Sequence, residues 1–326
     1  MTPTPVFLLS MPRGGSTWLQ RLIGCHDEIA TLNEPWFLLP LIYMRRRRGI
    51  SSEYWQDTCG KALGELFGRL DDGEAVFDAA VRAFAGRVHE AATPNGERYF
   101  LDKTPRYALV AEDIVRIFPD AKLIFLWRNP LSVLSSMLEL SGDRWLVPRF
   151  DIDLLEGWPR LVDLARKLGD RALCVRYEDL VRDRDAVLER IFGHLGLDFD
   201  PAMLDPARSG LAPGLMGDSK SNAMQSLDDG IRLTGWRQRL RGPLRRRWSK
   251  RYLAALGAER LAFMGYDAGD LDLASLQPCF RPKEWLGDLA CRGYAHAFHG
   301  LHLEYPLRRF AKRLSGRERG RQFGMI

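Results

Sequence analysis

Short apolar segments recur along the chain and alternate with longer stretches in which apolar residues repeat at the period of a helix. The short segments are rich in β-branched, aliphatic and aromatic residues, which is typical of buried strands. The predicted strands cover residues 6–10, 29–32, 99–102, 123–127 and 172–175. The predicted helices cover residues 17–23, 35–47, 54–70, 75–91, 107–118, 130–140, 154–168, 186–195 and 244–256.

This alternation predicts an α/β fold in which a central parallel sheet is flanked by helices. Residues 198–233 are rich in Gly, Pro, Ser and Asp and predict a long loop, a kind of segment that is usually functional or disordered. From residue 283 onward an amphipathic helical pattern leads to a basic stretch at 312–321. We therefore expect a main domain over 1–265 and a helical, basic C-terminal extension over 266–326.

Composition and charge narrow the class of protein. Hydrophobic residues make up 46% and charged residues 28% of the chain, the proportions of an ordinary folded domain. The formal net charge of +6 favours anionic partners, which include a nucleotide, an acidic polymer and a membrane surface.

The five cysteines are scattered without a CxxC pair, so the sequence signals neither a disulfide framework nor a zinc site. The first residues lack the pattern of a signal peptide, and no segment has the roughly 18 uninterrupted apolar residues of a membrane span. We expect a cytoplasmic protein.

The strongest local pattern is VFLLSMPRGGSTWL at residues 6–19, a strand followed by a glycine turn and the start of a helix. Such a turn presents backbone N–H groups and a helix N-terminus to an anion. Arg13 adds a fork of donors, and Ser16 and Thr17 add hydroxyl groups. The alternative is an ordinary turn between a strand and a helix.

The turn differs from the ATP-binding P-loop, because Gly15 stands where that loop has its lysine. The strand that ends at Trp127 is followed by Arg128, where many P-loop enzymes have an Asp that holds Mg²⁺. We therefore expect chemistry without a metal. A nucleotide or small-molecule kinase that uses ATP and Mg²⁺ remains the second hypothesis.

A second group of polar residues begins at the end of the fourth predicted strand. Arg128 precedes Asn129 and Pro130, and Ser136 follows eight residues after the arginine. A serine two helical turns along can lie on the same side as the arginine and contact the same phosphate. Taken alone, the pattern favours a helix cap with Ser136 facing a neighbouring helix; its agreement with the glycine turn favours the phosphate site.

Two further strands end in residues that can carry out chemistry, and ligands of parallel sheets bind at this edge. Glu34 follows the second strand, and its carboxylate can accept a proton. Lys103 follows the third strand and can stabilise charge on a leaving group. The alternatives are a favourable charge at a helix N-terminus for Glu34 and an exposed surface position for Lys103.

Together these segments resemble sulfotransferases that use 3′-phosphoadenosine-5′-phosphosulfate (PAPS), in a bacterial form similar to the carbohydrate and tyrosyl-protein enzymes. Residues 12–19, PRGGSTWL, are similar to the family's 5′-phosphosulfate loop, PRSGTTWL. Residues 123–136 are similar to its 3′-phosphate motif. The resemblance covers residues 4–195 and extends more loosely to residue 237.

The resemblance implies a three-layer, P-loop-like fold, PAPS as sulfuryl donor, its desulfated product PAP, and no metal. It implies catalytic roles for Glu34, Lys103 and Arg13. It implies that the nucleotide is bound by Arg13, Gly14, Gly15, Ser16, Thr17, Trp18, Arg128, Ser136, Arg232, Trp236 and Arg237. Many relatives carry a catalytic His just after the lysine; Pro105 lies there in this chain, which shifts the role of the base to Glu34.

The implied acceptor is the hydroxyl or amine of a carbohydrate, a small metabolite or a tyrosine. Residues 176–180 also resemble a family segment, and we expect them to close a strand and start a helix. The four arginines at 45–48 could attract an acidic acceptor or an anionic lipid, although a solvated helix end is the simpler interpretation. We expect no nucleic-acid partner, while peripheral membrane contact and a homodimer stay open.

Overall fold

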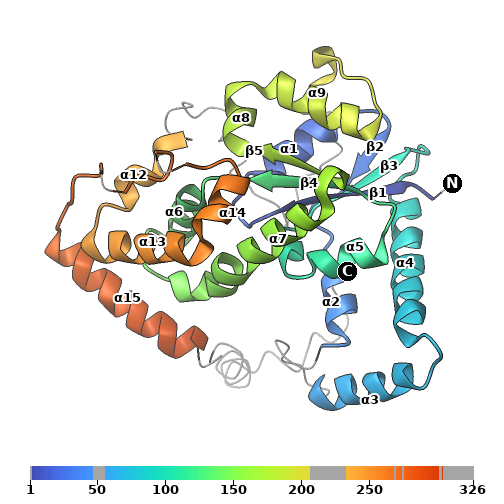
Figure 1. The fold of residues 1–326 in the computed structure, drawn as a ribbon, viewed down its shortest axis with the longest axis horizontal. Helices are drawn as coiled ribbons and strands as arrows, with labels where there is room; N and C mark the ends of the chain where they lie inside the picture. Colours follow the sequence, from blue (N-terminus) through green and yellow to red (C-terminus); the bar gives the residue numbers. More distant parts are fainter. Residues whose placement is uncertain are drawn as a thin grey trace, which may run out of the picture.

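The computed structural model describes residues 2–46, 56–205, 233–267, 269–273, 275–300 and 303. A five-stranded sheet lies at its centre (Figure 1). The strands are β1 (Thr4–Ser10), β2 (Ile29–Thr31), β3 (Tyr99–Asp102), β4 (Lys122–Trp127) and β5 (Ala172–Arg176). They are parallel in the order β2-β3-β1-β4-β5. The predicted parallel sheet is confirmed, and each strand lies within two residues of its predicted bounds.

The sheet is apolar on both faces, which explains the uninterrupted apolar segments in the sequence. Along β1, Val6 and Leu8 belong to one core, whereas Phe7 and Leu9 belong to the other; all four are fully buried. Because successive side chains of a strand point to opposite faces, such a strand needs helices on both sides. The predicted three-layer α/β fold is confirmed.

The helices form the two outer layers (Figure 1). One face is covered by α1 (Ser16–Ile23), α8 (Tyr177–Arg182) and α9 (Arg184–Leu195). The other face is covered by α2 (Leu38–Tyr43), α4 (Gly73–Ala91), α5 (Ala111–Ile117), α6 (Pro130–Leu140), α7 (Trp158–Leu168), α12 (Trp236–Arg239), α13 (Pro243–Leu256) and α14 (Ala258–Phe263). Helix α3 (Gln56–Gly68) packs against α4.

Three predicted helices differ from the structure by division or by more than two residues at an end. The predicted helix 35–47 begins later, at Leu38, because Trp36 adopts a left-handed φ of 58°, and it ends at Tyr43. The predicted helix 107–118 is divided into a 3₁₀ turn (Pro105–Leu109) and α5, because Val110 has a non-helical φ of −132°. The predicted helix 154–168 begins as a π-helical turn (Ile152–Gly157) before α7.

Shorter 3₁₀ turns cover Val147–Phe150, Gly169–Arg171 and Pro201–Met203. The last of these lies at the start of the predicted long loop, whose residues 206–232 fall outside the described part of the chain.

The helix predicted from residue 283 is present as α15 (Pro282–Gly300), which packs against α13 and the 3₁₀ turn Val147–Phe150 (Figure 1). Its buried Asp288 accepts two hydrogen bonds from Arg245 of α13, at 2.8 and 2.9 Å. The domain boundary at residue 265 stays a prediction, and the basic stretch 312–321 lies outside the described residues. Among the residues described, no helix combines the length and the apolarity needed to cross a membrane.

Candidate active site

The carboxyl ends of the paired strands β3, β1 and β4 lie side by side, and the loops that follow them share one edge of the sheet. This edge carries the glycine turn after β1, Lys103 after β3 and Arg128 after β4. Glu34 joins them from the segment that follows β2. The topology thus brings the predicted residues of four strand ends together, at the place where parallel sheets bind ligands.

The turn after β1 has a strained, left-handed backbone. Arg13 has a φ of 67° and Gly15 a φ of 91°, and the Gly14 N–H closes the turn on the Met11 carbonyl at 3.0 Å. Helix α1 begins at Ser16, and the N–H groups of Ser16 and Thr17 have no acceptor among the described residues. Such a helix start is a ready anion site.

Tyr177 restricts this turn to glycine. A Cβ atom at Gly15 would lie 2.3 Å from Cδ2 of the Tyr177 ring, far inside van der Waals contact. The lysine that an ATP-binding P-loop carries at this place would therefore clash with the tyrosine. The structure disfavours the kinase alternative.

Arg128 is a buried cation that contacts the glycine turn. Its Nη1 donates to the Arg13 carbonyl at 2.9 Å, and its guanidinium lies 4.2 Å from the centre of the Tyr177 ring. The buried Nε of Arg128 has no acceptor within the described ranges. A buried guanidinium with unfilled hydrogen-bonding capacity suits an anionic ligand.

The two predicted phosphate motifs contact each other. Arg13 Nε donates to Ser136 Oγ at 3.0 Å. Ser136 is held there by α6, whose start is capped by Asn129: its Oδ1 accepts from the N–H groups of Leu131 and Ser132 at 2.9 and 3.3 Å. The spacing of eight residues in the sequence therefore brings the serine beside the glycine turn.

Glu34 and Lys103 form an ion pair at the same edge. Lys103 Nζ donates to Glu34 Oε1 at 2.8 Å and to Thr17 Oγ1 at 3.2 Å. The lysine side chain is fully buried and that of Glu34 is 13% exposed. The surface position considered for Lys103 is therefore wrong. The Glu34 carboxylate and the hydroxyl of Thr17, at the start of α1, thus both lie within hydrogen-bond distance of the Lys103 ammonium group.

A profile of the sulfotransferase family matches residues 5–201, which is more than half of the chain. The chain belongs to the sulfotransferase family. The membership predicted from the motifs is confirmed.

The chain is also similar in sequence to individual named proteins. Nodulation protein NoeE of Sinorhizobium fredii is 28% identical over 243 residues, which cover 62% of this chain and 52% of that protein. Protein-tyrosine sulfotransferase 2 of Gallus gallus is 24% identical over 241 residues, which cover 70% of this chain and 60% of that protein. The chain thus spans about half to three fifths of the length of these two relatives.

Among solved structures, the sulfotransferase domain from the Synechococcus PCC 7002 olefin synthase has a TM-score of 0.47 and 28% identity, covering 72% of this chain and 88% of that chain.

The sulfotransferase motifs are supported by hydrogen bonds that the sequence did not predict. Trp36 Nε1 donates to Glu34 Oε2 at 3.2 Å, and the Trp36 N–H donates to Thr104 Oγ1 at 3.2 Å. Both bonds depend on the left-handed backbone of Trp36, which no pattern in the sequence predicts.

Glu178 supports the second phosphate motif. It accepts from the Asn129 N–H at 2.9 Å and from the Tyr266 hydroxyl at 2.7 Å. The sequence signal for this support was segment 176–180, which closes β5 and starts α8 as expected.

The residue before Lys103, Asp102, is a buried carboxyl group that lies near the buried His89. Asp102 accepts a hydrogen bond from the Tyr107 hydroxyl at 3.3 Å, and His89 Nε2 lies 4.0 Å from its Oδ2. Burial raises the pKa of Asp102 to about 7 and lowers the pKa of His89 to about 4. Near neutral pH, Asp102 is only partly ionised, so Glu34 is the main counter-ion of Lys103.

The remaining predicted nucleotide ligands have packing roles in the structure. Trp18 packs edge-on against Tyr177, with ring centroids 5.8 Å apart. Trp236 is buried in the main core, and the Arg237 guanidinium lies 5.2 Å from its ring. Arg232 lies outside the described residues. Nucleotide binding by these four residues stays a prediction.

The first arginines of the 45–48 cluster contact the protein itself. Arg46 Nη2 lies 2.7 Å from Asp113 Oδ2, and the Arg45 guanidinium lies 5.0 Å from the Phe77 ring. Arg47 and Arg48 fall outside the described part of the chain. These contacts favour a local structural role for Arg45 and Arg46.

Proposed function

We propose that this chain transfers the sulfuryl group of PAPS to a hydroxyl group of an acceptor and releases PAP. The observation that carries the proposal is the ion pair of the partly buried Glu34 with the fully buried Lys103, which adjoins Thr17 at the start of α1. In the reaction, a bond forms between the acceptor oxygen and sulfur while the bond between sulfur and the phosphate oxygen breaks. The acceptor proton moves to Glu34.

The donor groups at the sheet edge fit the charge of PAPS, which supplies an activated sulfuryl group when bound. The turn after β1 offers the N–H groups of Ser16 and Thr17 together with the Arg13 guanidinium. Arg128 contributes a buried cation whose Nε has no acceptor among the residues described. We assign the 5′-phosphosulfate to residues 13–18, and the 3′-phosphate to Arg128 and Ser136.

Glu34 is positioned to act as the base. Each of its carboxylate oxygens has its own donor, Lys103 Nζ on Oε1 and Trp36 Nε1 on Oε2, so the carboxylate is fixed in one orientation. A fixed carboxylate near the reacting oxygen can accept its proton during the attack.

Lys103 is positioned between the base and the anion-binding turn. It contacts both Glu34 and Thr17, so its charge can offset the negative charge that develops on the departing phosphate. The Thr17 hydroxyl accepts from Lys103 and keeps its own hydrogen to donate to an anion.

Two relatives support a hydroxyl acceptor. One is named for protein tyrosine and another for an omega-hydroxylated dihydromenaquinone. Both names denote acceptors with a hydroxyl group, phenolic in one and carried by a lipid in the other. We propose a carbohydrate, phenolic or lipid alcohol as the acceptor of this chain.

The test is transfer of labelled sulfur from PAPS to a panel of hydroxyl-bearing acceptors, with wild type and Glu34→Gln. We expect a labelled product for at least one acceptor, and a loss of kcat of about a hundredfold or more in E34Q with PAP binding retained. Arg182→Gln, an exposed change on α8, is the matched control. Full turnover by E34Q would contradict the proposed base.

A further inference from the structure

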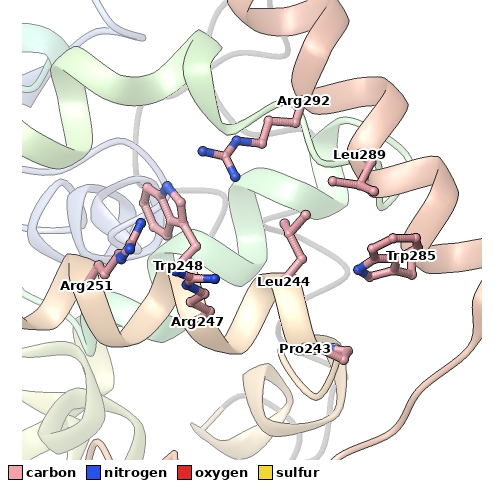
Figure 2. Close-up of a pocket in the computed structure, with 8 residues that line it drawn as sticks. All are labelled: Pro243, Leu244, Arg247, Trp248, Arg251, Trp285, Leu289 and Arg292. Carbon is pink, nitrogen blue, oxygen red and sulfur yellow. The ribbon is translucent and has the colours of Figure 1, made fainter.

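A groove of about 410 Å³ lies between α13 and α15 (Figure 2). Leu244 and Trp248 of α13 form one apolar wall, and Trp285 and Leu289 of α15 form the other. None of these residues belongs to the Glu34–Lys103 site. The volume and the apolar walls are those of a binding groove.

The groove is preformed because both walls are fixed. Trp248 stacks on Tyr252 with ring centroids 5.1 Å apart and packs edge-on against Trp145 at 5.6 Å. Helix α15 is held on α13 by the buried pair of Arg245 and Asp288, which share two hydrogen bonds. A ligand would meet these walls without first having to order them.

Three exposed arginines surround the apolar walls. Arg247 and Arg251 project from α13, and Arg292 reaches from α15 toward α13 (Figure 2). Within the described ranges, none of the three has a carboxylate partner. Arg245 of the same helix contrasts with them, because Asp143 and Asp288 neutralise it. The groove therefore carries a net positive charge.

Exposed apolar side chains continue from the groove along α15. Trp285 is 36% exposed, Leu289 39% and Leu286 60%. Phe280, 62% exposed, lies against Trp285 with ring centroids 6.2 Å apart. Such a continuous apolar surface marks an interaction site, and tryptophan is enriched where proteins meet the lipid–water boundary.

The arginines lie beside an apolar surface, so a complementary partner must carry both negative charge and apolar groups. A second copy of the chain docked through the same face would bring like charges together. The chain's own stretch 312–321 is rich in Lys and Arg, so its charge also has the wrong sign. An anionic phospholipid bilayer offers phosphate groups above an acyl layer and matches both features.

We infer that the α13–α15 surface docks this protein on an anionic phospholipid bilayer. Arg247, Arg251 and Arg292 bind the lipid phosphates. The side chains of Trp285, Leu286 and Leu289 enter the boundary between headgroups and acyl chains.

The test is sedimentation of the full chain with vesicles of phosphatidylcholine alone or mixed with phosphatidylglycerol. The wild type is expected to sediment with the mixed vesicles and not with the neutral ones. The variant Arg247→Glu/Arg251→Glu should bind the mixed vesicles at least about tenfold more weakly. The variant Arg182→Glu/Arg184→Glu changes the net charge equally on α8 and α9 and should bind like wild type.

A second variant tests the apolar contact without a change of charge. Trp285→Ser/Leu286→Ser should lose vesicle binding and retain PAP binding, which shows that the fold is intact. Four results would overturn the inference: equal binding to neutral vesicles, an equal loss in the α8–α9 control, competition by inorganic phosphate at constant ionic strength, or a lipid-free dimer that depends on the groove.

Discussion

At the scale of single residues, the two hydrogen bonds to Glu34 distinguish the proposed base from the group that orients it. Lys103 and Trp36 bind different oxygens of the same carboxylate. Of these two donors, Lys103 also contacts the start of α1, through Thr17. Trp36 is therefore a positioning residue that acts through Glu34.

The substitution Trp36→Phe tests this positioning role, because it keeps an aromatic ring and removes the indole N–H. We expect kcat to fall about tenfold, since a hydrogen bond to a charged group is worth roughly 1.5–3 kcal/mol. The KM for PAPS and the affinity for PAP should change little. Steady-state kinetics with a fixed acceptor measures kcat and KM separately. A change confined to KM would contradict the positioning role of Trp36.

Asp102 gives folding stability a dependence on pH. Burial raises its pKa to about 7, compared with about 3.9 in an unfolded chain. Between these values the folded state holds a proton that the unfolded state has released, so this group lowers stability as the pH rises from about 4 to 7. His89, with a pKa lowered to about 4, acts in the opposite direction over the range from about 4 to 6.5.

Asp102→Asn removes the ionisable carboxyl group and keeps an oxygen that accepts from Tyr107. We expect the variant to be more stable than wild type at pH 8, by an amount on the order of 2–4 kcal/mol. The difference should shrink as the pH is lowered toward 4, because Asp102 stays protonated in the folded state and the unfolded chain increasingly takes up the same proton. Thermal unfolding at several pH values measures this, and a difference that does not vary with pH would contradict the account.

At the scale of elements, the strands were predictable and several helix ends were not. A strand buried on both faces leaves a continuous apolar segment such as residues 123–127, and its carboxyl end identifies the residues that can bind ligands. Glu34, Lys103 and Arg128 were predictable for this reason. The support by Trp36 and by Tyr177 depends on a left-handed backbone and on a contact between distant segments, neither of which has a local pattern.

The turn between β1 and α1 requires glycine at position 15, and a substitution there tests this requirement. Gly15→Ala places a methyl group against Tyr177 at a φ of 91°. We expect a stability loss of about 2–4 kcal/mol and at least tenfold weaker PAP binding. Gly96→Ala is the control, because Gly96 has a φ of 79° and no atom within 4 Å of the added Cβ. For this control, chemical denaturation should show a loss of unfolding free energy of only about 1 kcal/mol. Titration with PAP should show an unchanged affinity.

At the scale of the whole molecule, residues beyond the family match complete the support of the site. The match ends at residue 201, yet the Tyr266 hydroxyl binds Glu178, and the Asp270 carbonyl accepts from the Asn129 side chain at 3.1 Å. Segments far apart in the sequence therefore fix the loop that carries Arg128. The motifs predicted which residues lie together at the edge of the sheet, whereas these distant contacts were not predictable because nothing in the local sequence specifies them.

The most direct test of the central claim is calorimetric titration of the full chain with PAP in the absence of metal, beside ADP with Mg²⁺. The account predicts that PAP binds and ADP does not bind measurably. Arg128→Ala should weaken PAP binding about ten- to a hundredfold, with Arg182→Ala unchanged as control. Folded protein that fails to bind PAP, or that binds ADP with Mg²⁺ more tightly, would contradict the account.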